Sequence, residues 1–154
     1  MHILSTHPRT PFFASVLFLI LSCLPALAQE QKVANYSFGK QGTKAYENFS
    51  FWAKAGKRGE ITYSYGKDRK EVKLTYLGKD TLQGENCFKV QFANGLILYI
   101  IPKGLSLKVV DSEGKYSKLF KWEYEGPIDG IGTFCDVCAD DEESIELIKE
   151  YFLK

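Results

Sequence analysis

The sequence predicts a mainly β domain of the α+β class: a single curved antiparallel meander sheet or half-barrel of about seven strands, with one C-terminal amphipathic helix. Three observations predict this fold. Apolar residues recur at every second position through most of residues 48–125. Short runs of glycine, asparagine, aspartate and proline separate the alternating segments. The spacing then becomes helical over residues 141–153.

The alternating segments each have the length of one strand. Phe88, Val90 and Phe92, for example, share one face of a strand, with Cys87 and Lys89 on the other. Because the connections are short, neighbours in sequence are expected to pair antiparallel. The seven predicted strands are 48–54, 60–66, 70–77, 86–92, 96–101, 104–111 and 118–125.

The turns give the next level of detail. Asn94-Gly95, between two apolar runs, predicts a type I′ hairpin, because both residues tolerate positive φ. Residues 29–46 are the least decided part of the chain, with a short strand near Tyr36 and Phe38 as one interpretation.

The C-terminal segment predicts a helix from Asp141 to Leu153. Ile145, Ile148 and Phe152 recur at i, i+3 and i+7. Asp140 and Glu143 have the spacing of a capping box. We expect this helix to pack its apolar face on the sheet.

The N-terminal residues have the pattern of a secretory signal peptide. A polar start is followed by the apolar run Phe12–Leu21 and a small-residue cleavage site that ends at Ala28. We therefore expect residues 1–28 to be removed and residues 29–154 to form one exported domain, periplasmic or secreted. The alternative is a lipid anchor at Cys23, where "ILSC" has the form of a lipoprotein cleavage site. No later segment has the length of a transmembrane helix.

Histidine composition excludes several kinds of chemistry. Both histidines, His2 and His7, lie in the predicted signal peptide. Serine–histidine and cysteine–histidine catalysis, histidine-ligated metals and c-type haem are thereby excluded from the mature domain. We expect a non-enzymatic protein without cofactor or metal.

Charge is distributed unevenly along the chain. Residues 32–121 hold 17 Lys and Arg against eight Asp and Glu, whereas residues 122–154 hold two against ten. Either both regions are solvated faces, or the lysine-rich sheet meets an anionic component of the cell envelope. Nucleic acid is not expected as a partner, because the basic residues form no compact cluster. The sequence does not predict the oligomeric state.

Three cysteines, Cys87, Cys135 and Cys138, remain after the signal peptide. Exported domains usually oxidise their thiols. One interpretation is a structural disulfide that fixes the C-terminal segment, either between Cys87 and one of the other two or locally between Cys135 and Cys138. The other is a redox-active CxxC, which the acidic residues around it disfavour because negative charge opposes a thiolate.

The segment from Tyr76 to Asp111 resembles exported lipoprotein-carrier proteins of the LolA-like superfamily. The matching phrase contains Gly78, Gly84 and Cys87-Phe88-Lys89-Val90, then Ile101-Pro102, Gly104-Leu105 and Lys108. Ile101 replaces the family's aspartate before the proline, and the family's internal helices have no counterpart. The resemblance implies a half-barrel whose concave apolar face could hold acyl chains, with a helix covering it.

Three functional hypotheses follow. In the first, a curved sheet holds a lipid or other apolar ligand on its aromatic side chains. The second is an envelope or surface interaction protein without a small ligand. The third is a small exported thiol-disulfide protein with Cys135 as nucleophile and Cys138 as resolving thiol. The candidate ligand-binding residues of the first hypothesis are Phe51, Tyr63, Tyr65, Tyr76, Phe88, Phe92 and Trp122.

Overall fold

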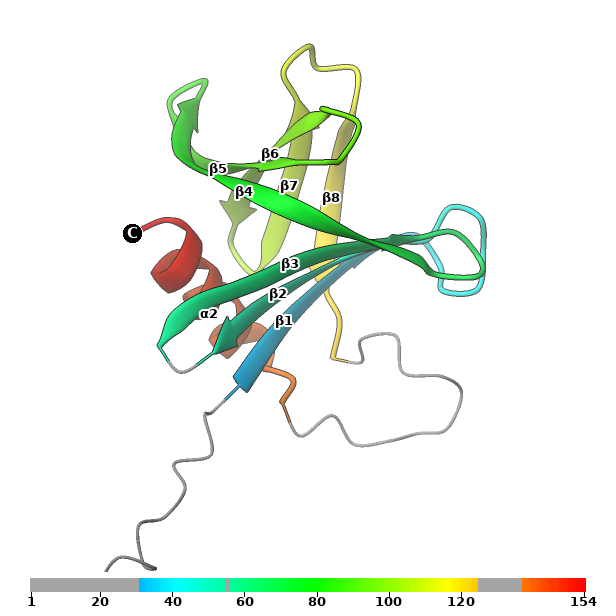
Figure 1. Cartoon of the computed structure of the whole chain (residues 1–154), viewed down its shortest axis with the longest axis horizontal. Helices are drawn as coiled ribbons and strands as arrows, with labels where there is room; N and C mark the ends of the chain where they lie inside the picture. The colour runs from blue at the N-terminus through cyan, green and yellow to red at the C-terminus, as the bar shows by residue number, and fades with distance from the viewer. Residues whose placement is uncertain (1–30, 55, 125–136) are drawn as a thin grey trace, which may run out of the picture.

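The computed structural model of the chain describes residues 31–54, 56–124 and 137–154. It shows eight strands that form a closed antiparallel barrel in sequence order, followed by one helix (Figure 1). The predicted antiparallel meander with a C-terminal helix is therefore confirmed. The strands are β1 (Gln31–Phe38), β2 (Glu47–Lys54), β3 (Lys57–Tyr65), β4 (Lys70–Leu82), β5 (Glu85–Gln91), β6 (Ile97–Lys103), β7 (Ser106–Asp111) and β8 (Ser117–Trp122).

The closed barrel corrects the prediction of about seven strands in an open sheet or half-barrel. β1 pairs with β2 along its whole length and with β8 through Tyr36 and Ser37. The sequence left this strand undecided because its burial does not alternate: Val33, Ala34, Asn35 and Tyr36 are all buried. A strand covered on both faces gives no period-two signal.

Two β-bulges interrupt the ladders. One lies between Phe51 and Ala53 of β2, and the other between Tyr76 and Gly78 of β4. Bulges bend a strand and increase its twist, which a small barrel needs in order to close. Opposite the first bulge, a Cβ on Gly59 would lie 2.7 Å from the carbonyl oxygen of Trp52, so no side chain fits there.

The Asn94-Gly95 hairpin forms, but with a different turn. Only Gly95 has a positive φ, of 87°. The Gly95 amide donates to the Phe92 carbonyl, and the Phe92 amide donates to the Leu96 carbonyl, both at 2.9 Å. The loop therefore contains residues 93–95, the three-residue hairpin class, rather than the two-residue type I′ turn.

The helix α2 (Asp141–Phe152) begins as the sequence predicts. The Asp140 side chain accepts a hydrogen bond from the Glu143 amide, and the Glu143 side chain accepts one from the Asp140 amide. Ile145, Leu147, Ile148 and Phe152 are buried in the same core as the barrel interior.

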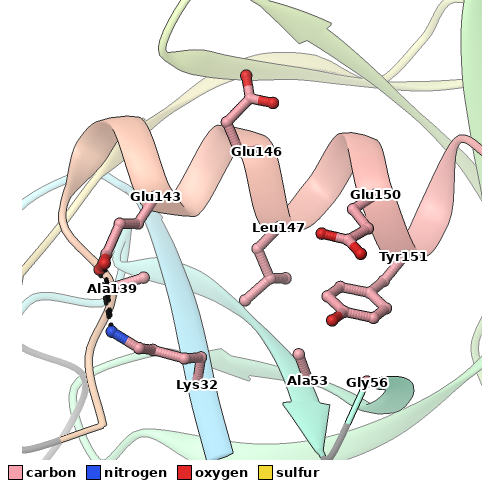
Figure 2. Close-up of a pocket in the computed structure, with 9 residues that line it drawn as sticks. All are labelled: Lys32, Ala53, Gly56, Ala139, Glu143, Glu146, Leu147, Glu150 and Tyr151. Atoms are coloured by element: carbon pink, nitrogen blue, oxygen red, sulfur yellow. Dashed lines mark hydrogen bonds and ion pairs between the residues drawn. The ribbon is translucent and has the colours of Figure 1, made fainter.

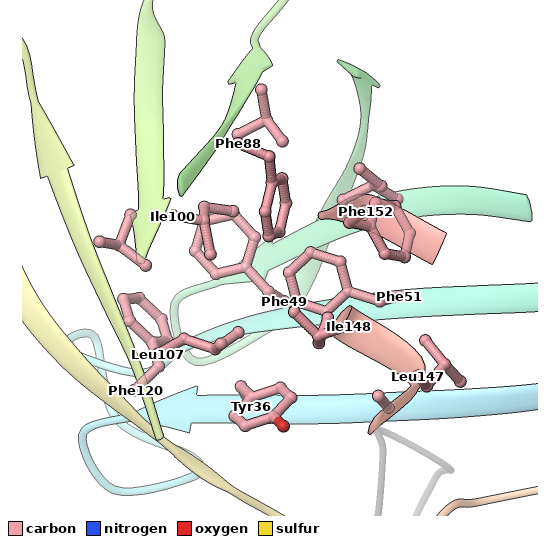
Figure 3. Close-up of a cluster of buried hydrophobic side chains, with 14 of the residues drawn as sticks. Tyr36, Phe49, Phe51, Phe88, Ile100, Leu107, Phe120, Leu147, Ile148 and Phe152 are labelled. Atoms are coloured by element: carbon pink, nitrogen blue, oxygen red, sulfur yellow. The ribbon is translucent and has the colours of Figure 1, made fainter. Parts of the chain in front are cut away.

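Aromatic rings fill the interior beside the helix (Figure 3). Phe152 of α2 packs with ring centroids 5.4 Å from Phe51 and 5.3 Å from Phe88. Phe49 lies 5.0 Å from Phe120. All five side chains are fully buried. The concave apolar face that the resemblance implied is thus the packed core of a closed barrel.

Candidate functional site

The two ends of the barrel differ because connections in an antiparallel meander alternate between them. The connections 39–46, 66–69, 92–96 and 112–116 lie at one end, and those at 55–56, 83–84 and 104–105 lie at the other. The helix occupies the second end, where it packs on β1, β2 and β3. We call the first end the mouth.

A pocket of about 470 Å³ opens at the mouth and is named here the mouth pocket. This volume is within the range of small-molecule sites. Its rings come from Tyr63, Tyr65, Phe92 and Tyr116. Its remaining walls come from Val72, Ala93, Asn94, Leu96 and Leu98.

Local structure explains why these residues meet. Tyr63 and Tyr65 are alternate residues of β3, so both face the same side of the sheet as the buried Ile61. Phe92 and Leu96 flank the three-residue loop between β5 and β6. Tyr65 and Leu96 remain 42% and 46% exposed, large values for side chains of their size and apolar character. The pocket is therefore an exposed continuation of the interior face.

The rings of the mouth pocket are held in a definite arrangement. Tyr63 and Tyr65 are stacked, with centroids 5.7 Å apart and planes 22° apart. Phe92 meets Tyr63 edge-on, at 5.2 Å and 79°. Such stacked and edge-to-face pairs are the preferred aromatic geometries. The stacked tyrosines give the pocket a flat wall, and the Phe92 ring stands across one side of that wall.

An ion pair lies behind two of these tyrosines. Glu47 is the inward residue at the start of β2, with its side chain only 13% exposed, and its Oε1 is paired with the Lys118 ammonium. The Tyr116 hydroxyl donates to Glu47 Oε2 at 2.5 Å. The Lys118 ammonium also lies over the Tyr116 ring, 4.7 Å from its centroid. Glu47 thus accepts bonds from both groups and fixes the Tyr116 ring at the pocket wall.

The tyrosine hydroxyls at this end resist ionisation. Burial is the main cause that raises the pKa of Tyr116 far above its usual value, and its hydrogen bond to Glu47 adds to the shift. Burial and the nearby Glu47 carboxylate raise the pKa of Tyr63 in the same way. Both hydroxyls stay protonated over the physiological range, so neither supplies a phenolate nucleophile or base.

The seven aromatic residues predicted as ligand-binding do not share one location. Tyr63, Tyr65 and Phe92 come together at the mouth pocket. Phe51 and Phe88 lie in the closed core, and Tyr76 donates its hydroxyl to the Phe152 carbonyl at 2.9 Å.

Trp122 contributes to the attachment of the helix. Its indole Nε1 donates to the Ala139 carbonyl at 3.1 Å, immediately before α2. Four of the seven predicted residues therefore build the helix end and its packing, whereas the other three line the pocket.

Sequence analysis did not single out Glu47, Tyr116 or Lys118. A signal for Glu47 was present: it continues the inward series of Phe49 and Phe51, and a carboxylate on an apolar face requires a partner. Its partners, Tyr116 and Lys118, are about 70 residues away in the chain, and only barrel closure brings them to β2.

A second hollow, of about 430 Å³, lies between α2 and the ends of β1 and β2 (Figure 2). Figure 2 shows Leu147 and Tyr151 pointing from the helix toward Ala53 and Gly56. Lys32 Nζ lies 3.2 Å from Glu143 Oε2 at its edge. This hollow is the junction of helix and sheet, and its glutamates line the solvent side.

The cysteines occupy different sides of the barrel. Cys87 is a buried free thiol on the outer face of β5, packed with Ile101 and Val110. The backbone of Cys138 forms an isolated parallel β-bridge with Val33 of β1. Strand β5, which carries Cys87, is four strands from β1 in either direction around the barrel. The predicted bridge from Cys87 to Cys135 or Cys138 is therefore not formed.

The remaining thiol interpretations fall partly outside the structure. Burial raises the pKa of the Cys87 thiol, which makes it a poor nucleophile. Cys135 lies outside the described residues, as do the predicted signal peptide and Cys23. The local bridge between Cys135 and Cys138 stays a prediction.

Several of the lysines that suggested an anionic partner are engaged within the sheet. Lys73 pairs with Glu60, Lys89 with Asp80, and Lys103 with Glu85. Such exposed pairs contribute little to stability but lower the net field of the surface. An anionic envelope partner stays a prediction. Part of the positive charge of the sheet that would attract it is balanced by these acidic residues.

Comparisons with family models, curated proteins and solved structures found no match to this chain. Within the described residues, no group of three or more His, Cys, Asp or Glu is placed to hold a metal ion. In the same part of the chain, no helix is both long and apolar enough to cross a membrane. The mouth pocket is thus assigned as the candidate site from its own geometry.

Proposed function

We propose that this chain is an exported, non-enzymatic binding protein that holds a small apolar ligand in the mouth pocket. The observation that carries the proposal is the convergence of Tyr63, Tyr65 and Phe92, three of the aromatic residues predicted from sequence, on one open pocket. An apolar pocket with a few polar groups at its edge is the usual form of a small-molecule site.

The packing of the barrel limits where such a ligand can lie. Phe51, Phe88 and Phe152 fill the interior at the helix end, so an acyl chain cannot run through the barrel without displacing the helix. The proposal therefore departs from the carrier mechanism that the LolA-like resemblance implies. The ligand sits at the mouth, on the exposed continuation of the aromatic interior.

The proposal is tested by titrating the protein, purified from an exporting host, with the neutral fluorescent probe N-phenyl-1-naphthylamine. The expected result is saturable enhancement with one site. We expect Leu96→Ser and Tyr65→Ser each to weaken binding roughly tenfold, the equivalent of about 1.4 kcal/mol.

Two matched variants provide the control. Leu119→Ser and Tyr124→Ser change residues that are 48% and 42% exposed, like Leu96 and Tyr65, but do not line the pocket. Both should bind the probe as the unmodified protein does. Absence of saturable binding, or equal losses in all four variants, would contradict the proposal.

A further inference from the structure

The described residues that line the mouth pocket present no charged side chain to a ligand. Of the residues that line it, only Asn94, Tyr63, Tyr65 and Tyr116 carry polar side-chain atoms, and no Lys, Arg, His, Asp or Glu is among them. The ion pair behind the wall is internally compensated, because Glu47 is bound to the Lys118 ammonium. A ligand carboxylate, phosphate or amine would lose its hydration here without gaining an opposite charge.

Two of the few polar atoms at the pocket already hold hydrogen bonds within the protein. The Tyr116 hydroxyl donates to Glu47. The Asn94 side-chain oxygen accepts the Leu96 amide at 3.1 Å. What Tyr116 offers a ligand is therefore its ring rather than its hydroxyl. A sugar needs several convergent donors and acceptors, whereas this lining is mostly aromatic and aliphatic surface.

The shape of the wall favours a flat molecule. The stacked pair Tyr63 and Tyr65 exposes a broad ring surface, because Tyr65 is partly open to solvent. Phe92 stands almost perpendicular to Tyr63 and borders that surface. A planar ring can stack on one side and meet an edge on the other, which uses both preferred aromatic geometries at once. A flexible chain uses neither and loses rotational freedom on binding.

Resting on the proposed function, we propose that the ligand of the mouth pocket is a neutral, flat aromatic compound. The recognition is by ring stacking on Tyr63 and Tyr65 and by the edge of Phe92. Glu47 and Lys118 lie behind the Tyr116 ring, on the side away from the ligand, and do not touch it.

Competition against the bound probe tests the ligand class. Five competitors are compared at pH 7. Naphthalene is neutral and flat, 1-naphthoate and 1-naphthylmethylamine add a negative or a positive charge, 1-decanol is a flexible chain, and methyl glucoside is a sugar. Naphthalene should displace the probe at least tenfold more effectively than any of the other four compounds.

The hydroxyl and the ring of Tyr116 are separated by two substitutions. Tyr116→Phe keeps the ring and should leave naphthalene affinity within about twofold, since each factor of ten requires about 1.4 kcal/mol. Tyr116→Ser removes the ring and should weaken binding roughly tenfold. Thermal unfolding of both variants, followed by circular dichroism, establishes that each is folded under the binding conditions.

The outcomes separate this inference from the proposed function. Probe binding with stronger displacement by 1-naphthoate, the amine, decanol or the glucoside would overturn the neutral aromatic assignment and leave the binding site standing. An equal loss of affinity in Tyr116→Phe and Tyr116→Ser would overturn the assignment of the Tyr116 ring, rather than its hydroxyl, as the group that contacts the ligand. Failure of the probe to bind at all would overturn the proposed function itself.

Discussion

The two ends of this barrel differ in how the apolar interior meets solvent. At the helix end, α2 inserts Phe152 between Phe51 and Phe88, and apolar packing excludes water. At the mouth no helix of the described residues covers the interior, and the last inward side chains are tyrosines around the ion pair of Glu47 and Lys118. The interior face of one barrel can thus end in a covered core at one end and in a solvent-exposed rim at the other, and the rim leaves room for a ligand on the interior face.

The largest expected effect comes from breaking the covered end. Phe152→Ala removes a fully buried ring that contacts three other rings, and should lower the free energy of unfolding by about 3–5 kcal/mol. Chemical denaturation measures it. Glu150→Ala, on the exposed side of the same helix, is the control. A loss below about 1 kcal/mol for Phe152→Ala would show that α2 is not part of the cooperative core.

At the mouth, the ion pair can be tested by a double-mutant cycle. Glu47→Gln and Lys118→Met each leave a partly buried charge without the opposite charge that compensates it. The coupling energy between the two substitutions should be roughly 1–2 kcal/mol. Urea denaturation of both single variants and the double variant gives this value. The pair Lys115 and Glu113, exposed on both side chains, is the comparison and should couple by less than about 0.5 kcal/mol. Equal coupling energies would contradict a special role for the buried pair.

A smaller effect is expected where the helix begins. Asp140→Ala removes the N-cap side chain that accepts the Glu143 amide, and should cost about 1 kcal/mol. The side chain of Glu142, in the same turn, makes no capping bond within the described residues, so Glu142→Ala should cost only a few tenths of a kcal/mol. If the two substitutions cost the same, the first turn is stabilised by charge rather than by the cap.

Tyr36 lies in the interior between the two ends. The substitution Tyr36→Phe should change stability little at neutral pH and clearly at alkaline pH. Its buried hydroxyl has no hydrogen-bond partner among the described residues, so Tyr36→Phe should be neutral or slightly stabilising at pH 7. Burial raises the pKa of Tyr36 above its usual value, and Asp141 adds to the shift. The folded state therefore keeps the proton that the unfolded state releases above about pH 10. Stability should fall as pH rises past that point, less steeply in Tyr36→Phe.

Denaturant midpoints measured from pH 8 to 11 test this expectation. Parallel pH profiles for Tyr36→Phe and the unmodified protein would contradict it. So would a fall in stability at pH 7 comparable to that of Phe152→Ala.

The last prediction concerns thiols and needs no change in stability. Cys87 is a free buried thiol. If residues 1–28 are removed on export and Cys135 and Cys138 form the predicted local bridge, alkylation of the unreduced, denatured protein from an exporting host should label one cysteine, Cys87. Peptide mass spectrometry identifies the site. Labelling of all three cysteines would remove the predicted bridge, and labelling of Cys138 in place of Cys87 would reverse the assignment.

Several elements were predictable because their signals are local. The capping box of Asp140 and Glu143 and the apolar spacing of Ile145 and Ile148 define α2 within a few turns of chain. Alternation marked the strands from β2 to β8, although β8 ends at Trp122 rather than at residue 125. The strand β1 was undecided because Val33 and Asn35, on its outer face, are buried as well.

The candidate site was predictable only in part. Alternation identified Tyr63, Tyr65 and Phe92 as inward residues, but it identified Phe51 and Phe88 by the same criterion. Nothing local distinguishes an inward ring near the helix from one near the mouth. That distinction depends on which end of the barrel each residue occupies.

By itself the sequence determined the antiparallel meander, the C-terminal helix with its cap, and the aromatic character of the interior, because hydrophobic periodicity and turn chemistry act over a few residues. Only the tertiary structure decided that the sheet closes, that Glu47 meets Tyr116 and Lys118, and that α2 covers one end of the barrel while the described residues leave the mouth pocket open at the other. These features depend on contacts between residues distant in the chain, which are set by strand register, bulges and the packing of the whole interior.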